Sequence, residues 1–550
     1  LRFLAAALLA ATLAVPSGCG RRMGDAADGF GMDLTPPADA RQRGAIIFIV
    51  DGVNAAIFRE MLDAGELPAI REFFLDRGLY VPQAVGNIPS VTLANLPAIA
   101  TGRFPGHHNI TGINWFDRYA RIWRNYETLL QKNRLDLDHN APLIYQACPD
   151  AFTASLFFQP HRGATKFYEN WMSSGPLYGL ARYEAVDMVT VSRFGEMMGL
   201  ARQRGQFPRI VTAYLLTTDF RAYGYGVSSP QYRKAMHYVD RLIGGVCRDL
   251  RAAGLLETIV LAFVSDHSLG DVTTHFPMNA FLRDHLGLPV SDLRIHENVA
   301  YPQRRALYAN ETVVTYGSGD RYWALCLRKP VQAGSDAAGF EPWDIRPEPS
   351  DLATWPLPAG GTIDLPRTLA DRKEIDAIAY ATGPNRCRVR TADGEVEFHQ
   401  ADGRGGEITY CLTHGTDPLG WIDHVPAELL AGGAASPDAW LATTHATQYP
   451  DLPAQIVAYF RSTRAGDIAC FAAPGYDFRT VHNGGHGGLR PYDDMFTPLL
   501  LAGPGVPRTT GHLVRTVDLT PTILDLVGCP PLPDLDGQSL TTVPWWTTPD

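Results

Sequence analysis

The chain has 550 residues, of which 45% are hydrophobic and 19% are charged, so it holds ample apolar material for a folded core. It carries 48 Lys and Arg against 58 Asp and Glu, a formal net charge of −10, which disfavours a basic protein that binds a nucleic-acid duplex. No run of 18 or more apolar residues occurs, which excludes a polytopic membrane protein. Length alone suggests three or four domains.

Residues 1–19 are predicted to be an export leader. Arg2 precedes an uncharged run from Phe3 to Val15, which is too short to span a bilayer but typical of an export signal. Cys19 follows a small residue, as in a bacterial lipobox, so we expect a periplasmic or cell-envelope lipoprotein anchored through a lipid on Cys19. Pro16 departs from the usual lipobox Leu, which leaves cleavage by an ordinary signal peptidase open. Residues 20–43 are expected to form a linker.

Short apolar runs separated by helical periodicity follow the linker. The clearest helix has a Ser N-cap and a Pro at its first position, Ser229-Pro230, and stops near Gly254. Alternating strands and helices predict an α/β fold with a mostly parallel sheet and helices on both faces. The runs read as buried parallel strands are residues 45–50, 151–158, 210–216, 258–264 and 498–502.

The character of the chain changes between residues 301 and 467. This region has many Pro and Gly residues, little helical periodicity, and a tight-turn signal at Asp393-Gly394. We interpret it as an inserted β-rich cap subdomain that interrupts a core formed by residues 44–300 and 468–545. Its aromatic residues could line a pocket, although packing in a core is the commoner use.

The eight cysteines give little direction. No Cys-x-x-Cys motif occurs, so a cysteine-based zinc site is disfavoured. Cys387 and Cys411 flank a hairpin-like stretch and are the predicted disulfide pair. Most of the others are expected to be small buried apolar residues.

Three acidic residues come just after the carboxyl ends of predicted strands: Asp51, Asp219 and Asp266, the last with His267 beside it. Ligands of open parallel sheets bind at that edge. Each Asp alone would commonly be a turn or N-cap residue. Together the three carboxylates predict a metal site, because like charges at one place need a cation to stay ionised.

Two further segments join this group. Thr92 stands at the expected start of a helix, where backbone N–H groups and the helix dipole favour an anion. A bound metal could deprotonate its hydroxyl and make it a nucleophile, although a plain N-cap Thr is the structural alternative. His486 lies among four glycines, and such open backbone allows a close approach to a metal.

The ordered set of segments resembles the alkaline phosphatase superfamily, most closely its type I phosphodiesterase/nucleotide pyrophosphatase family. The resemblance covers roughly residues 44–290 and 468–542. The segments that carry it are Ile49-Val50-Asp51-Gly52, Pro89-Ser90-Val91-Thr92, Thr101-Gly102-Arg103-Phe104-Pro105-Gly106-His107-His108, Ser265-Asp266-His267-Ser268, Gly485-His486-Gly487, Val517 to Leu526, and Asp536 to Leu540.

The resemblance implies an alkaline-phosphatase-like fold and a hydrolase with two divalent metal ions, usually zinc. It also implies that Thr92 is the nucleophile, and that Asn114, one position late against the usual spacing, steadies a phosphoryl oxygen. Carried over position by position, one metal would be held by Asp51, Thr92, Asp266 and His267, and the other by Asp219, His486 and a second His four residues after Asp219.

That second His is absent, because the position is Tyr223. A phenol binds zinc less readily than an imidazole does. Three explanations stay open: Tyr223 ligates as a tyrosinate, His482 or His275 substitutes for the missing ligand, or the second metal site is weak.

We therefore expect an exported, metal-dependent hydrolase of small phosphate esters that acts through a covalent phosphothreonine. The alternative is a catalytically impaired binding module of the same fold. Sulfatase chemistry is disfavoured because no Cys/Ser-x-Pro-x-Arg sequence surrounds Thr92, and no Gly-x-Ser-x-Gly elbow of a serine hydrolase occurs. The sequence does not select the substrate or a preference for diesters over monoesters.

Overall fold

The computed structural model describes residues 28–128, 131–169, 175, 177–331 and 339–547. The predicted leader with Cys19 lies outside these residues, and so does the first part of the predicted linker. The backbone N–H groups of Phe30, Gly31 and Met32 donate to the carboxylate of Asp249 in helix α10 (Pro230–Ala252). This part of the linker segment is therefore held against the core and is not a free tether.

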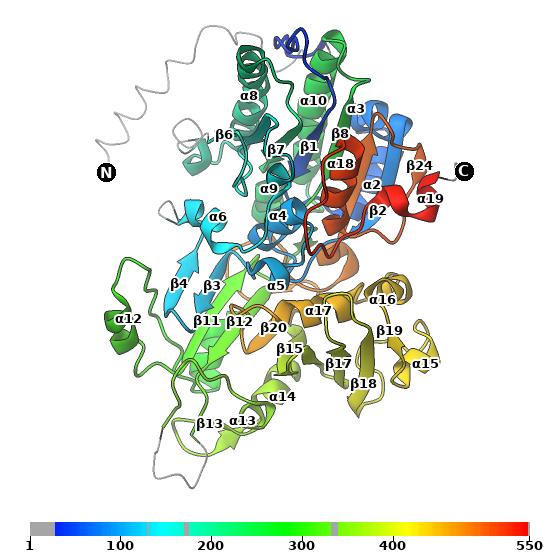
Figure 1. The fold of residues 1–550 in the computed structure, drawn as a ribbon. Helices are drawn as coiled ribbons and strands as arrows, with labels where there is room; N and C mark the ends of the chain where they lie inside the picture. Colours follow the sequence, from blue (N-terminus) through cyan, green and yellow to red (C-terminus); the bar gives the residue numbers. More distant parts are fainter. Residues whose placement is uncertain (1–27, 129–130, 170–174, 176, 332–338, 548–550) are drawn as a thin grey trace.

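An eight-stranded sheet forms the upper half of the molecule as drawn in Figure 1. All neighbouring strands in it are parallel apart from the two pairs made by β23. In spatial order the strands are β24 (Thr509–Thr510), β2 (Gly78–Val85), β23 (Phe496–Ala502), β8 (Ile259–Val264), β1 (Gly44–Val50), β7 (Ile210–Leu215), β5 (Thr153–Leu156) and β6 (Lys166–Tyr168).

Both faces of this sheet are covered. Successive residues of β1 point to opposite faces, and they pack into two different apolar clusters. One cluster contains side chains of α2 (Ala55–Asp63), α8 (Tyr183–Arg204) and α10, and the other contains side chains of α4 (Thr92–Thr101) and α18 (Leu519–Val527). The predicted α/β class with helices on both faces is confirmed, as is the helix that starts at Ser229-Pro230, whose Ser229 side chain accepts from the N–H of Tyr232.

One strand direction was predicted wrongly. The run at 498–502 does lie in the sheet, as β23, but it is antiparallel to both neighbours, β2 and β8. A short apolar run indicates burial but carries no information on direction. In the structure a π-helical turn, Pro491–Met495, directly precedes β23.

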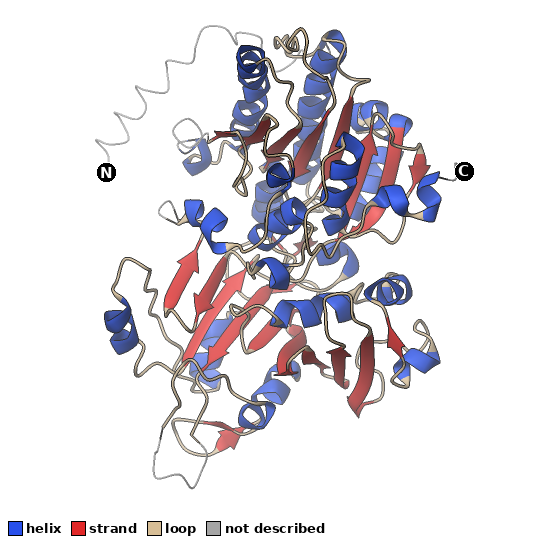
Figure 2. Ribbon diagram, in the orientation of Figure 1, coloured by secondary structure: helices blue, strands red, loops and turns tan. Residues whose placement is uncertain are grey.

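A second, antiparallel eight-stranded sheet lies below the first in Figure 1, and Figure 2 shows its strands in red with helices on its flanks. It supplies the β-rich region that the sequence predicts. The sequence predicts that the core resumes at residue 468, yet β20, which starts there, belongs to the second sheet. The division into a core of residues 44–300 and 468–545 and an insertion of residues 301–467 stays a prediction. Its strands are, in order, β11 (Val313–Ser318), β12 (Tyr322–Leu327), β20 (Ile468–Ala472), β15 (Ile375–Gly383), β16 (Arg386–Thr391), β17 (Gly394–Gln400), β18 (Ile408–Gly415) and β19 (Ala434–Ala435).

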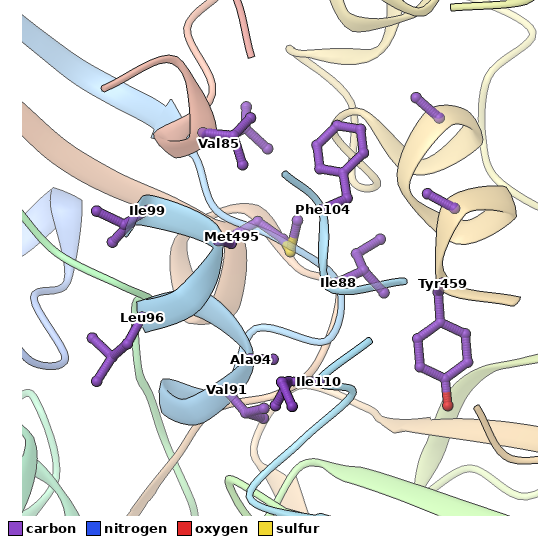
Figure 3. Packing of buried hydrophobic residues seen from close by; sticks show 14 of the residues in the cluster. Val85, Ile88, Val91, Ala94, Leu96, Ile99, Phe104, Ile110, Tyr459 and Met495 are labelled. Atoms are coloured by element: carbon purple, nitrogen blue, oxygen red, sulfur yellow. The ribbon is translucent and has the colours of Figure 1, made fainter. Parts of the chain in front are cut away.

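Helix α4 is fixed in place by the apolar cluster between the two sheets. Figure 3 shows Leu96 and Ile99 of α4 together with Met495, and Tyr459 of α17 (Leu452–Phe460) on the other side. All these side chains are at most 2% exposed. Close packing of this kind leaves a helix little freedom to shift, so the first residue of α4, Thr92, has a defined position.

The predicted disulfide is wrong. Cys387 and Cys411 are both free thiols, whereas Cys148 and Cys529 form a disulfide between residues 381 positions apart.

The large aromatic residues of the second sheet region are buried in its core, because they are at most 9% exposed; they are Tyr322, Trp323, Trp343, Trp355 and Trp421. Among the described residues, no helix combines the length and the hydropathy needed to cross a membrane.

Candidate two-metal active site

The three predicted carboxylates meet at one edge of the core sheet. β8, β1 and β7 are neighbours, and Asp266, Asp51 and Asp219 follow their carboxyl ends. Asp219 lies in the first turn of α9 (Thr217–Tyr225). All three side chains are at most 5% exposed. The sequence argument from parallel strands therefore placed these residues correctly next to one another.

Thr92 contacts this group directly. Its Oγ1 lies 2.9 Å from Nε2 of His267, and that nitrogen lies 3.3 Å from Asp51 Oδ1 and 3.4 Å from Asp266 Oδ2. Val91 is the N-cap of α4, so the Thr92 hydroxyl is not used as the helix cap. The alternative that Thr92 is a plain N-cap residue is therefore wrong.

His486 comes to the same edge from the loop after β22 (Gly484–Gly485). Its ring stacks on that of His267 with 3.6 Å between centroids. Nδ1 of His486 lies 2.8 Å from Ser90 O, and Nδ1 of His267 lies 2.9 Å from Ser268 O. Each imidazole thus uses Nδ1 for the backbone and turns Nε2 toward the carboxylates.

Two groups of side chains offer ligand atoms that lie within 4.8 Å of one another: Asp51 with Asp266 and His267, and Asp219 with His267 and His486. Four of these atoms are buried and have no hydrogen-bond partner among the described residues, namely Asp51 Oδ1, Asp219 Oδ1, Asp266 Oδ2 and His486 Nε2. Buried polar atoms are normally paired. The residues present therefore fit divalent cations, whose preferred ligands include carboxylate oxygens and neutral imidazole nitrogens.

The pKa shifts of these side chains also indicate a cation site. Burial, followed by the charges of neighbouring carboxylates, raises the pKa of Asp51 and Asp219 well above the usual range, and burial raises the pKa of Asp266 to about 7. Burial lowers the pKa of His267 to about 3 and that of His486 well below its usual range. Protein groups alone do not neutralise this cluster of acids, whereas cations would.

Tyr223 stands where the resemblance expects a His. Burial, then the carboxylates of Asp320 and Asp219, raise the pKa of its hydroxyl well above the usual range, so the surrounding protein favours the neutral phenol. Of the two possible substitutes, His482 lines the same cavity. His275 does not line it, and its Nδ1 lies 2.9 Å from Asp477 Oδ1.

The side chain of Asn114 does not lie where a residue that steadies a phosphoryl oxygen beside Thr92 would lie. Its side-chain amide donates to Gly317 O at 3.1 Å, and Asn114 is not among the residues that line the cavity beside Thr92. Its neighbour Ile113 lines the cavity instead. The role of Asn114 stays a prediction.

The cavity above the two groups has a volume of about 450 Å³ and lies between the two sheets. One wall is aromatic: the ring of Phe220 lies 4.4 Å from that of Tyr183 and 5.1 Å from that of Tyr178. Asp320, from the turn between β11 and β12, and Arg479 also line it. Sequence reasoning missed both, because an Asp after Gly in a hairpin is typical of a turn and gives no sign of a site.

Two other segments that carry the resemblance, Thr101–His108 and Asp536–Leu540, contact each other. Nδ1 of His107 lies 2.7 Å from an Asp536 oxygen, and the N–H of Phe104 donates to the same carboxylate at 2.8 Å. These residues tie the end of α4 to the C-terminal part of the chain, and they do not line the cavity.

Comparison with known proteins gives the following similarities. The family model described as type I phosphodiesterase / nucleotide pyrophosphatase matches residues 45–319. A Schizosaccharomyces pombe protein named as an uncharacterised pyrophosphatase/phosphodiesterase is 23% identical over 42% of this chain. Mouse ectonucleotide pyrophosphatase/phosphodiesterase family member 1 is 25% identical over 45% of this chain, and Crotalus adamanteus venom phosphodiesterase 2 is 23% identical over 43%. The matches cover only 45%, 26% and 28% of these relatives, respectively.

Proposed function

Because the chain belongs to the type I phosphodiesterase/nucleotide pyrophosphatase family, we propose that it hydrolyses small phosphate esters at the cavity beside Thr92. The observation that carries the proposal is the position of the Thr92 hydroxyl. It lies 2.9 Å from His267 Nε2 and does not cap helix α4. A partly exposed hydroxyl at the first position of a helix, lining a large cavity, is suited to attack a bound phosphoryl group.

The proposal assigns two divalent cations, zinc by preference, to the two groups of ligand atoms. Asp51, Asp266 and His267, with Thr92, would hold one, and Asp219 and His486 would hold the other. When bound, such cations supply positive charge to the attacking and leaving oxygens of an in-line displacement.

The chain's own residues account for the rest of the reaction. The N-terminus of α4 directs backbone N–H groups and the positive end of its dipole toward the phosphoryl oxygens. Attack by Thr92 Oγ1 forms a bond to phosphorus while the bond to the ester oxygen breaks, and the alcohol leaves with the proton that the hydroxyl loses. Water then cleaves the bond between Oγ1 and phosphorus and restores the hydroxyl; a monoester substrate yields phosphate and a diester yields a phosphate monoester. The aromatic wall formed by Tyr178, Tyr183 and Phe220 would hold the organic part of the substrate.

A catalytically impaired binding module is the second candidate function. Tyr223 favours it, because a neutral phenol replaces an imidazole beside Asp219 and His486. Metal content and turnover distinguish the two functions: the enzyme would hold two cations and cleave bis-p-nitrophenyl phosphate, and the binding module would do neither.

Substitution of Thr92 tests the proposed nucleophile. We expect Thr92→Ala to lower turnover of bis-p-nitrophenyl phosphate by at least about 10³-fold, because the attacking oxygen is lost. Thr92→Ser should retain measurable turnover. Thr101→Ala is a matched control, since Thr101 is a buried Thr of the same helix whose hydroxyl donates to Pro97 O at 2.7 Å. Turnover by Thr92→Ala at the control's rate would refute the proposal.

We also infer that the protein is exported and anchored to a membrane by a lipid on Cys19. The leader-like segment before Cys19 supports this inference. Cys19→Ser should move the protein from the membrane fraction to the soluble fraction of cells that process lipoproteins. Equal distribution of both forms would contradict the anchor.

A further inference from the structure

Helix α9 carries Asp219 of the second ligand group, yet no side chain of its own caps its N-terminus. The N-cap residue is Leu216, whose side chain has no oxygen, and Asp219 lies in the first turn. The first helical hydrogen bond, from the N–H of Phe220 to Leu216 O, is long at 3.4 Å. The N–H groups at the start of a helix need acceptors, and helix ends that lack them fray. The position of Asp219 therefore depends on acceptors from another part of the chain.

Asp187 of helix α8 supplies these acceptors. Its Oδ1 accepts from the N–H of Leu216 at 2.9 Å, and its Oδ2 accepts from the N–H of Thr217 at 3.1 Å. Asp187 is fully buried, at 0% exposed. One carboxylate thus holds the two N–H groups that stand three and two positions before Asp219, at the junction of β7 and α9.

The surroundings of Asp187 give no other reason for an acid at this position. Among the buried residues near it on α8 are Val186, Val191 and Phe194, which are apolar. Burial of a carboxylate among apolar side chains costs free energy unless the carboxylate is hydrogen-bonded. In the described part of the chain, every hydrogen bond of this carboxylate goes to the start of α9. The compensation for burying Asp187 therefore lies at α9.

Two further contacts hold the residues on either side of Asp219. The hydroxyl of Thr218 donates to Asp51 O, and Nε and Nη2 of Arg221 donate to Oε1 of Glu184 at 2.8 and 2.7 Å. The ion pair is 22% and 33% exposed at its two side chains, so solvent weakens it. Of the two contacts that α8 makes here, the fully buried one at Asp187 is therefore the stronger constraint on α9.

We propose that Asp187 is a positioning residue of the second ligand group: by capping α9 it sets where Asp219 presents its oxygen to the cation. Oδ1 of Asp219 has no hydrogen-bond partner among the described residues and lies 4.0 Å from His486 Nε2. Metal sites require ligand distances within about 0.2 Å of their preferred values, so a small shift of α9 weakens binding. The proposal rests on the proposed use of the cavity as a two-metal site.

The test measures zinc binding and needs no turnover. Full-length protein is stripped with a chelator, and zinc stoichiometry and affinity are measured by competition with a chromophoric chelator. The equivalent that Asp219→Ala loses is the one held at Asp219. We expect Asp187→Ala to weaken this equivalent by about 10-fold and to leave the other unchanged. Asp187→Asn should bind this equivalent more tightly than Asp187→Ala does, because an Asn oxygen also accepts at a helix start.

Asp240→Ala is a matched control for loss of a buried cap. Asp240 of α10 is 3% exposed and accepts from the N–H groups of Ala69 at 3.3 Å and Ile70 at 2.8 Å. It thus caps helix α3 (Pro68–Phe73), whose N-cap residue Leu67 likewise has no side-chain bond. Because α3 carries none of the proposed ligands, Asp240→Ala should lower thermal stability much as Asp187→Ala does and bind both zinc ions like the wild type.

Several results would overturn the proposal. These are wild-type affinity at the Asp219 equivalent in Asp187→Ala, equal weakening of both equivalents in that variant, the same weakening in Asp240→Ala, or a single equivalent in the wild type. Thermal unfolding of each stripped variant checks that it folds. If Asp187→Ala does not fold, Asp187→Ser takes its place, since the shorter side chain cannot reach both N–H groups, and it should show the same selective loss. Selective loss in a protein without any hydrolysis would refute the proposed function and support this proposal.

Discussion

At the scale of single residues, Tyr214 is a support of the first ligand group. Its hydroxyl donates to Asp51 Oδ2, which leaves Asp51 Oδ1 as the atom turned toward His267 and without a hydrogen-bond partner among the described residues. Residues that orient a metal ligand typically affect metal affinity about 10–100-fold. We therefore expect Tyr214→Phe to weaken zinc binding at the Asp51 group by about that factor, as measured by chelator competition.

Tyr145→Phe is the control for this prediction. Tyr145 is also a fully buried tyrosine, but its hydroxyl contacts Thr212, which is not a proposed ligand. Both variants lose one buried hydrogen bond, which costs about 1 kcal/mol of stability. A similar change of zinc affinity in both variants, or none in Tyr214→Phe, would contradict the role given to Tyr214.

The residues of the site differ in how far the sequence could predict them. Asp51 and Asp266 follow apolar strands, and that context together with a neighbouring His was enough to place them. Asp320 has no such context, because it belongs to a different sheet and its approach to His486 depends on backbone pairing across 166 positions. Residues that meet only through tertiary pairing carry no signal in the local sequence.

At the scale of elements, the turn between β11 and β12 depends on Gly319. Its φ is +64°, and a Cβ added there would lie 2.5 Å from Nδ1 of His486 and 2.6 Å from its backbone oxygen. Gly319→Ala therefore requires His486 to move. We expect this variant to lose at least about 10-fold in affinity for the second zinc ion, in addition to a strain of about 1–2 kcal/mol from the left-handed backbone.

Gly361→Ala provides the comparison, because it has the same kind of strain without the clash. Gly361 has a φ of +81° and no atom within 4 Å of an added Cβ, and it lies just before β14 (Thr362–Ile363). Chemical denaturation should show a comparable loss of stability from backbone strain in both variants. Zinc affinity should fall only in Gly319→Ala; an unchanged second site there would show that the turn does not set the position of His486.

At the scale of the whole molecule, the sequence predicted the fold class correctly but did not predict the direction of one strand or the pairing of the cysteines. The α/β class followed from alternating apolar runs and helical periodicity, and both sheet faces are buried as expected. The antiparallel direction of β23 and the pairing of Cys148 with Cys529 depend on how distant segments return to the core. The hairpin that suggested Cys387 and Cys411 exists, but Cys387 is buried in the sheet whereas Cys411 is exposed on the next strand but one.

The Cys148–Cys529 disulfide should stabilise the molecule as a whole, because it closes most of the chain into one loop. We expect Cys148→Ala/Cys529→Ala to lower the free energy of unfolding by about 2–4 kcal/mol in urea titrations, with no change in zinc affinity. Cys411→Ala, at an exposed free thiol, should leave stability unchanged. Peptide mapping without reductant should recover Cys148 linked to Cys529. Recovery of Cys387 linked to Cys411, or equal stability of the double variant and the wild type, would contradict this assignment.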